Sequence, residues 1–117
     1  MNQRNIQQLE RAIERAKAEI LQLGNLRPGA LTQQYSVCGT PGCRCAANPP
    51  QKHGPYYQLS YTLKKKSTTR FVRKEEVARI RKEVQTYARL KRRVERWVEL
   101  EAELSDLKLR RAKSRKV

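Results

Sequence analysis

The chain has 117 residues, of which 38% are hydrophobic and 32% charged, so we expect one small domain at most, with a limited core. Its 27 Lys and Arg against 11 Asp and Glu give a formal net charge of +16, which attracts polyanions, nucleic acid first among them. Because the sequence shows neither the apolar run of a signal peptide nor one long enough to cross a bilayer, we expect no membrane role and a cytoplasmic location.

Apolar residues in the first 24 positions recur every three or four residues, which is typical of a helix that packs against another helix. The stripe consists of Ile6, Leu9, Ile13, Ala16, Ile20 and Leu23. Gly24 stands where a left-handed C-terminal cap is expected. The pattern predicts an amphipathic helix in the segment 1–24 that covers its own domain, with an intermolecular coiled coil as the alternative.

All three cysteines and the only histidine lie within one short segment, at Cys38, Cys43, Cys45 and His53. Cys₃His is a standard ligand set for structural zinc, and it leaves no position open for a catalytic water. We therefore predict a knuckle with a structural zinc ion as its cofactor. The alternative is that the cysteines are merely small buried or oxidation-prone residues. A catalytic Cys–His pair is not expected, because no acidic residue that could orient the histidine occurs from residue 38 to residue 74.

The segment 25–73 is predicted to combine this knuckle with a β-hairpin. Alternation from Tyr56 to Leu63 is typical of a half-buried strand, with Tyr57, Leu59, Tyr61 and Leu63 on one face. Residues 68–73 are predicted to form the returning strand. The loop between them, residues 64–67, lacks the Gly or Asn that favours a tight turn.

Residues 74–111 contain no Pro or Gly, and their apolar positions recur at helical spacing. They predict a helix about 55 Å long that packs antiparallel on the first helix, which could cover only about half of it. Residues 112–117 are predicted to be a basic tail. The expected fold is therefore α+β: an N-terminal helix, a Cys₃His zinc knuckle, a β-hairpin and a long C-terminal helix.

Positive charge without any negative charge marks the segment 38–74. Its Lys and Arg residues are candidate phosphate contacts, and Tyr56 is a candidate for stacking on bases. The basic candidates are Arg44, Lys52, Lys64, Lys65, Lys66, Arg70, Arg73 and Lys74. The alternative is that these residues form only a solvated rim. A second basic set on the long helix, from Arg89 to Arg96, is expected to be a solvated face, with phosphate contact as its alternative.

Four blocks of this sequence, in this order, resemble a small prokaryotic domain family of unknown function. They are Arg27–Tyr35, Cys38–Cys45, His53–Tyr57 and Phe71–Glu75. Members of that family often occur in or beside transposase and other mobile-element genes. The resemblance implies association with nucleic acid and supports the three cysteines and the histidine as one unit.

From charge and resemblance together, we predict a nucleic-acid-binding accessory or regulatory factor of a mobile element, with DNA favoured over RNA as partner. The alternative is a protein-interaction module whose long C-terminal helix pairs with a second copy or with a transposase. An enzyme is not expected, because two-metal nuclease chemistry needs several convergent carboxylates and Asp106 is the only Asp.

Overall fold

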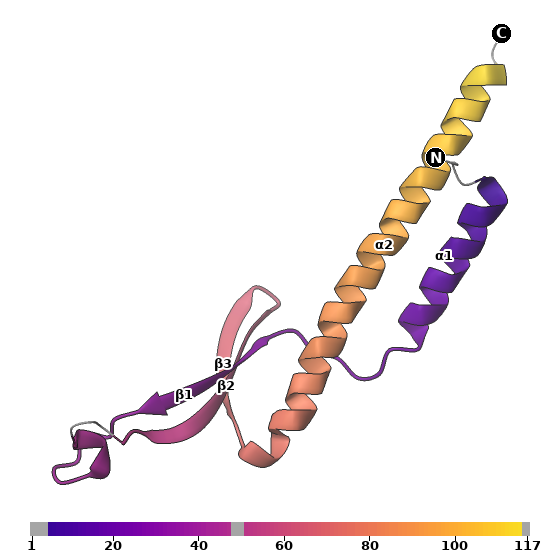
Figure 1. Ribbon diagram of the computed structural model, residues 1–117. Helices are drawn as coiled ribbons and strands as arrows, with labels where there is room; N and C mark the ends of the chain where they lie inside the picture. Colours follow the sequence, from indigo (N-terminus) through magenta and orange to yellow (C-terminus); the bar gives the residue numbers. More distant parts are fainter. Residues whose placement is uncertain (1–4, 48–50, 116–117) are drawn as a thin grey trace. The chain divides into compact units, whose positions relative to one another are not determined.

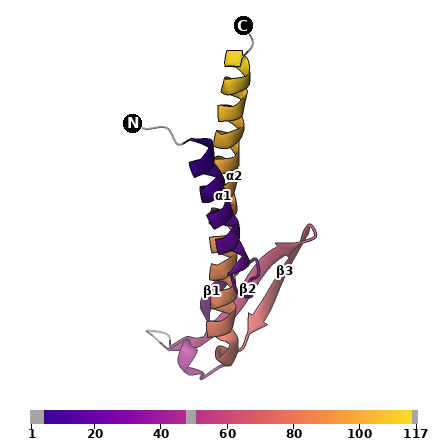
Figure 2. The same ribbon diagram turned by 90° about the vertical axis from the view of Figure 1, so that its right-hand side faces the viewer.

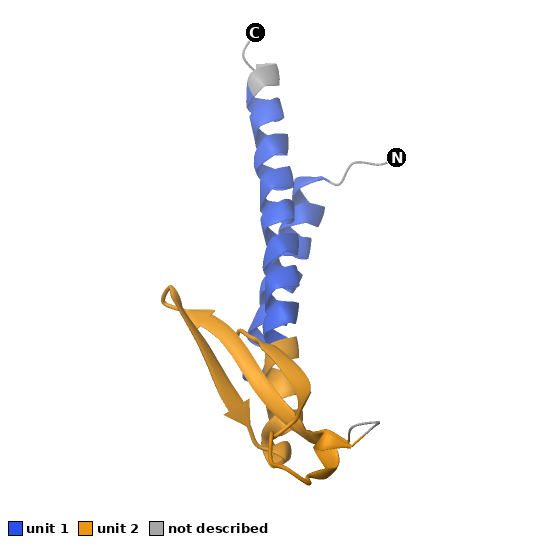
Figure 3. Cartoon of the chain, turned by 90° about the vertical axis from the view of Figure 1, so that its left-hand side faces the viewer, with its two compact units in different colours: residues 1–25, 86–117 blue, residues 26–85 orange. Residues whose placement is uncertain are grey.

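The computed structural model describes residues 5–47 and 51–115. Figure 1 shows the main elements in chain order: α1 (Ile6–Leu21), β1 (Ala30–Ser36), β2 (His53–Leu63), β3 (Lys66–Val72) and α2 (Val77–Arg115). Two short 3₁₀ turns, η1 (Arg44–Ala46) and η2 (Lys74–Glu76), complete the set. The chain divides into two compact units (Figure 3), which we call the helical unit, residues 1–25 and 86–117, and the sheet unit, residues 26–85.

The helical unit is an antiparallel pair formed by α1 and the C-terminal part of α2 (Figure 1). Asn5 caps α1: its side-chain Oδ1 accepts a hydrogen bond from the Gln8 backbone N–H at 2.8 Å, and Gln8 Oε1 accepts one from the Asn5 backbone N–H at 3.0 Å. The core of this unit consists of Leu9, Ile13, Ala16, Leu100 and Leu104. The three α1 members belong to the apolar stripe seen in the sequence, so the predicted helix packing is confirmed.

The helices differ from the sequence prediction at their ends. Helix α1 ends at Leu21, and Gly24 is not among the residues with positive φ, so the predicted left-handed cap is wrong. Helix α2 begins at Val77, after η2, and continues to Arg115. Of the predicted tail, residues 112–115 are thus helical and residues 116–117 lie outside the described part of the chain. Neither described helix is long and apolar enough to cross a membrane.

The sheet unit contains a three-stranded antiparallel sheet in the order β1-β2-β3. The predicted hairpin corresponds to β2 and β3, whereas β1 was not predicted. Strand β1 has no clean alternation of apolar and polar residues, and six of its seven residues are exposed. What makes it a strand is its pairing with β2, for example Leu31 with Leu59, which is a long-range contact that the local pattern does not encode.

The two faces of the sheet differ in burial. One face carries the predicted apolar row, with Leu59 1% exposed and Tyr57 and Tyr61 half-buried, although Leu63 near the strand end is 55% exposed. We call the other the open face, because Gln58 is its only half-buried member and the rest are exposed. Strand register places on it Ala30, Thr32, Gln34, Tyr56, Gln58, Ser60, Thr62, Ser67, Thr69 and Phe71.

Gly29 and Arg27 pack against the face of the sheet that carries Leu59 and Tyr61, which we call the covered face. At Gly29, φ is 137°, and a Cβ atom would lie 2.7 Å from Leu59 Cδ1, so the close approach of β1 to β2 requires glycine here. The Arg27 guanidinium lies 4.5 Å from the centre of the Tyr61 ring, and the Arg27 backbone N–H donates to the Glu83 carbonyl at 3.2 Å. The Tyr61 ring is therefore in contact with Arg27 within the fold.

The β2–β3 connection is a two-residue turn, shorter than the loop predicted from the sequence. Lys64 and Lys65 both have positive φ, 53° and 64°. A hairpin loop of two residues with this geometry is the primed type that matches the twist of the strands and that Asn-Gly normally forms. Two lysines therefore occupy a conformation that costs on the order of 1 kcal/mol each for residues with a side chain.

Candidate metal centre and basic surface

The four predicted metal ligands come from the β1–β2 connection and from the strand that follows it. Cys38 lies two residues after β1, Cys43 directly precedes η1, Cys45 lies within η1, and His53 is the first residue of β2. Strand register pairs His53 with Ser36, which brings the two ends of the connection together. Figure 2 shows this connection at one end of the sheet and the β2–β3 turn at the other.

The ligand atoms of these four residues converge. Each residue offers one ligand atom, and all four atoms lie within 4.8 Å of one another. Cys38 Sγ lies 3.4 Å from Cys45 Sγ, and Cys43 Sγ lies 3.1 Å from His53 Nε2. Tetrahedral zinc with its usual bond lengths holds such atoms about 3.5–3.8 Å apart, so the cluster has the size of a site for one ion.

The 3₁₀ turn η1 explains how Cys43 and Cys45 can serve one site although only one residue separates them. Cys43 has extended backbone angles and the chain turns at once into η1, with the Ala46 N–H donating to the Cys43 carbonyl at 3.0 Å. As a result the Cys43 sulfur lies beside His53 Nε2. Cys45, a residue that is 1% exposed, accepts a hydrogen bond through its sulfur from the Cys38 backbone N–H at 3.3 Å.

Hydrogen bonding and burial affect two of the thiols in opposite directions. Hydrogen bonds from Thr40, first from its hydroxyl and then from its backbone N–H, lower the pKa of Cys38 to about 6. At Cys45 the hydrogen bond from Cys38 also favours the thiolate, but desolvation and the neighbouring sulfurs outweigh it and raise the pKa. The hydrogen bonds at Cys38 therefore favour its thiolate form, and a thiolate among neighbouring sulfurs is a natural ligand for a cation.

The predicted basic residues do not form one surface: they fall into two groups. Lys64, Lys65 and Lys66 lie at the β2–β3 turn. The second group, at the knuckle end of the sheet, consists of Arg44, Lys52, Arg73 and Lys74. Because β2 has eleven residues, the two groups lie about 30 Å apart along the strand. All seven side chains are exposed.

The remaining two candidates of the sheet unit lie on different faces. Arg70 pairs with Leu59 and so belongs to the covered face, at an exposed edge position. Tyr56 is 44% exposed and belongs to the open face. The sequence prediction did not name Phe71 as a site residue, yet this side chain is 78% exposed on the same open face. Successive residues of a strand point to opposite faces, so Phe71 and Val72 must lie on different faces of the sheet. This alternation was the signal that could have identified Phe71 as an exposed aromatic residue.

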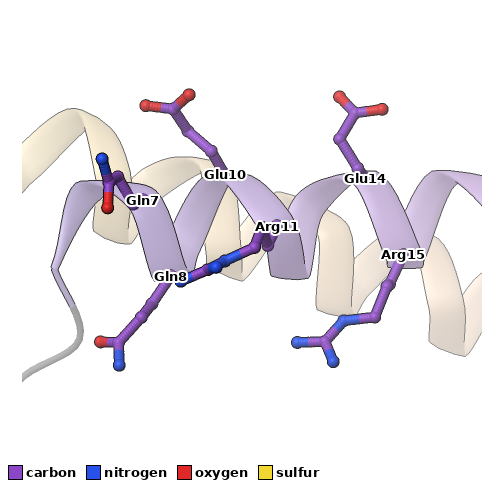
Figure 4. A pocket seen from close by; sticks show the side chains of 6 residues that line it. All are labelled: Gln7, Gln8, Glu10, Arg11, Glu14 and Arg15. Atoms are coloured by element: carbon purple, nitrogen blue, oxygen red, sulfur yellow. The ribbon is translucent and has the colours of Figure 1, made fainter.

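Surface hollows of different character lie on the described part of the helical unit. One, of about 350 Å³, is lined by Ala16, Glu19, Arg89, Arg92, Arg93 and Arg96. Four arginines of the second basic set thus share one hollow, in which Arg93 pairs with Glu19. Another is formed by α1 alone, and Figure 4 shows its side chains, Glu10 and Arg15 among them, pointing outward in different directions. These side chains do not converge on a common point, so we do not treat this hollow as a candidate site.

Fold and site together define a small α+β protein with a helical pair, a three-stranded sheet and a Cys₃His group that could hold a metal ion. The chain belongs to the family described as Domain of unknown function (DUF6788), which matches residues 6–82. The matched part includes α1, the whole sheet, the Cys₃His group and the beginning of α2. Membership in a family of unknown function, expected from the sequence, is confirmed. Neither a curated protein nor a solved structure matches the chain significantly.

Proposed function

We propose that the chain is a nucleic-acid-binding module, with DNA as the favoured partner, in which a structural zinc ion holds the knuckle beside the sheet. The observation that carries this proposal is the charge of the sheet unit. From residue 26 to residue 74 it contains nine Lys and Arg and no Asp or Glu. Exposed basic groups in a stretch of chain without acidic residues attract phosphates, whereas segments that are merely solvated normally mix both signs.

Zinc is the metal that best suits the donor set. Three thiols and one imidazole are soft and borderline ligands, and their atoms are spaced for tetrahedral coordination. Four protein ligands would fill the coordination shell, so the ion would support the fold and would not activate water. Cys38, Cys43, Cys45 and His53 would then fix η1, with Arg44 on it, next to the start of β2.

Binding to labelled oligonucleotides tests the proposal directly. Single-stranded and duplex DNA and RNA of equal length are titrated with the protein at 50 mM salt and again at 200 mM salt. We expect binding at 50 mM that weakens steeply with salt, because each phosphate contact releases counterions. The absence of binding to all four probes at 50 mM would refute the proposal.

Several apolar side chains of α2 favour the second candidate, a helical interaction module. Val94 is 37% exposed and Val98 58%, and they lie one turn apart, while Leu109 further along the helix is 65% exposed. A second copy of the chain or another protein could cover this row. Sedimentation analysis separates the two candidates: this one requires a stable dimer or a protein complex in the absence of nucleic acid. The accessory role beside a transposase stays a prediction that the family resemblance supports.

A further inference from the structure

The open face of the sheet carries two exposed aromatic side chains. Phe71 is 78% exposed and Tyr56 44%. Strand register pairs Phe71 of β3 with Gln58 of β2, and Tyr56 lies two residues before Gln58 on the same face. The two aromatic residues are thus diagonal neighbours on adjacent strands, where side chains lie about 7–8 Å apart.

The strand residues that share the open face with these rings carry no charge, and all but Ala30 are polar. Ser60 and Thr69 form a hydroxyl pair at 3.3 Å, Thr62 and Ser67 another at 3.0 Å, and Thr32 donates to the Gln58 carbonyl at 3.4 Å. An apolar partner would leave these groups without water as a hydrogen-bonding partner, which opposes its docking. A flat surface that combines exposed rings with amides and hydroxyls suits ligands that have a π-face and a polar edge.

The charges at the ends of the sheet narrow the class of ligand. Basic residues lie at both ends, Lys64 to Lys66 at the turn and Arg73 with Lys74 at the knuckle end, and no acidic residue lies on any of the three strands. A ligand that stacks on the centre of the face would thus find cations on either side of it. Nucleic acid offers bases and phosphates in this arrangement, but in a duplex the base faces are stacked on one another and cannot meet a protein ring.

We propose that the open face of the sheet is a stacking platform for single-stranded nucleic acid, with Phe71 and Tyr56 each in contact with one base. The basic groups at the two ends of the sheet hold the backbone. This inference rests on the proposed function and specifies it: the preferred ligand is unpaired, and binding tolerates different base sequences because every base has a face.

Substitutions that remove the rings but keep apolar bulk test the platform. Phe71→Leu and Tyr56→Leu should each weaken binding of a labelled oligothymidylate by roughly 5-fold or more, as expected for loss of one base stack. The salt slope should stay unchanged, because neither substitution removes a charge. Phe71→Tyr should retain most of the affinity, because it keeps a ring in place.

Tyr35→Leu is the matched control. Tyr35 is 54% exposed, but its hydroxyl accepts a hydrogen bond at 2.9 Å from Gln33, which lies on the covered face and not on the open face. It should change affinity less than twofold. Circular dichroism and metal content verify that all variants fold.

If the parent binds oligonucleotides but Phe71→Leu and Tyr56→Leu bind them as tightly as the parent does, the platform is refuted while the proposed function stands. If duplex competes as well as single strands, or if the ring substitutions only dissociate a dimer, the platform is also refuted. If the parent binds no oligonucleotide, both fail.

Discussion

Replacing the two turn lysines by Asn-Gly should stabilise the protein and weaken its binding to nucleic acid at the same time. Lys64 and Lys65 have positive φ, and Lys64→Asn with Lys65→Gly supplies the residue pair that this turn geometry prefers. The cost of placing two lysines in this conformation is relieved, and part of the gain is lost to the greater freedom of glycine in the unfolded chain. We expect the free energy of unfolding to rise by about 1 kcal/mol.

The effect on binding follows from the two charges removed. Each phosphate contact contributes about 0.7 to the salt slope with single strands and about 0.9 with duplex, so the slope should fall by about 1.4 to 1.8. Between 50 and 200 mM salt, the parent should therefore lose roughly 7- to 12-fold more affinity than the variant. Fluorescence anisotropy with labelled oligonucleotides gives the slopes, and thermal unfolding followed by circular dichroism gives the stability.

A matched control removes two charges from the helical unit instead. Lys108→Gln with Arg110→Gln neutralises two exposed residues of α2 and should leave the slope close to that of the parent. An unchanged slope in the Asn-Gly variant would show that the turn does not contact phosphates. An equal fall in the control would show that only total charge matters, and a loss of stability would contradict the turn geometry.

Three further outcomes test the metal centre and the two units. His53→Ala should reduce bound metal from about one zinc per chain to well below that, measured by elemental analysis of protein purified without added zinc; a folded parent that contains no metal would contradict the site. Gly29→Ala should destabilise the sheet unit by a few kcal/mol, because a Cβ there would lie 2.7 Å from Leu59 Cδ1, and denaturant unfolding would show it. Leu100→Ala should destabilise the helical unit by about 2–5 kcal/mol, since its side chain is 2% exposed, yet retain the metal. Metal loss in this last variant would show that the two units do not fold independently.

The parts of the fold that sequence reasoning found are those with a strong local pattern. The apolar stripe of α1 and the alternation around Leu59 each repeat over several turns or residues, and the centre of each pattern is buried: Leu9, Ile13 and Ala16 in α1 and Leu59 in β2. The Cys₃His group was found because its residue types are rare and their chemistry is specific. Metal ligands can be recognised in sequence without knowledge of the path of the chain between them.

What the sequence did not reveal depends on contacts between distant segments. Strand β1 exists because it pairs with β2, and nothing in Ala30–Ser36 alone distinguishes it from a loop. The turn at Lys64 and Lys65 lacks its usual residues, so its length was misjudged. The sequence also did not show that the basic residues of this segment fall into two groups, because the length of β2, which separates them, depends on its pairing with β1 and β3.

The position of the Cys₃His group has a consequence for the entropy of the unfolded chain. Cys38 follows β1 and His53 begins β2, so an ion bound there would close a loop of 16 residues at the base of two paired strands. A covalent cross-link that closes a loop of this length is worth about 3 kcal/mol, because it removes extended conformations from the unfolded ensemble. Thiolate–metal bonds give the same restriction and, unlike a disulfide, are compatible with reducing conditions. The ion would thus act as a reversible staple, and the pairing of β1 with β2 would depend on the supply of metal.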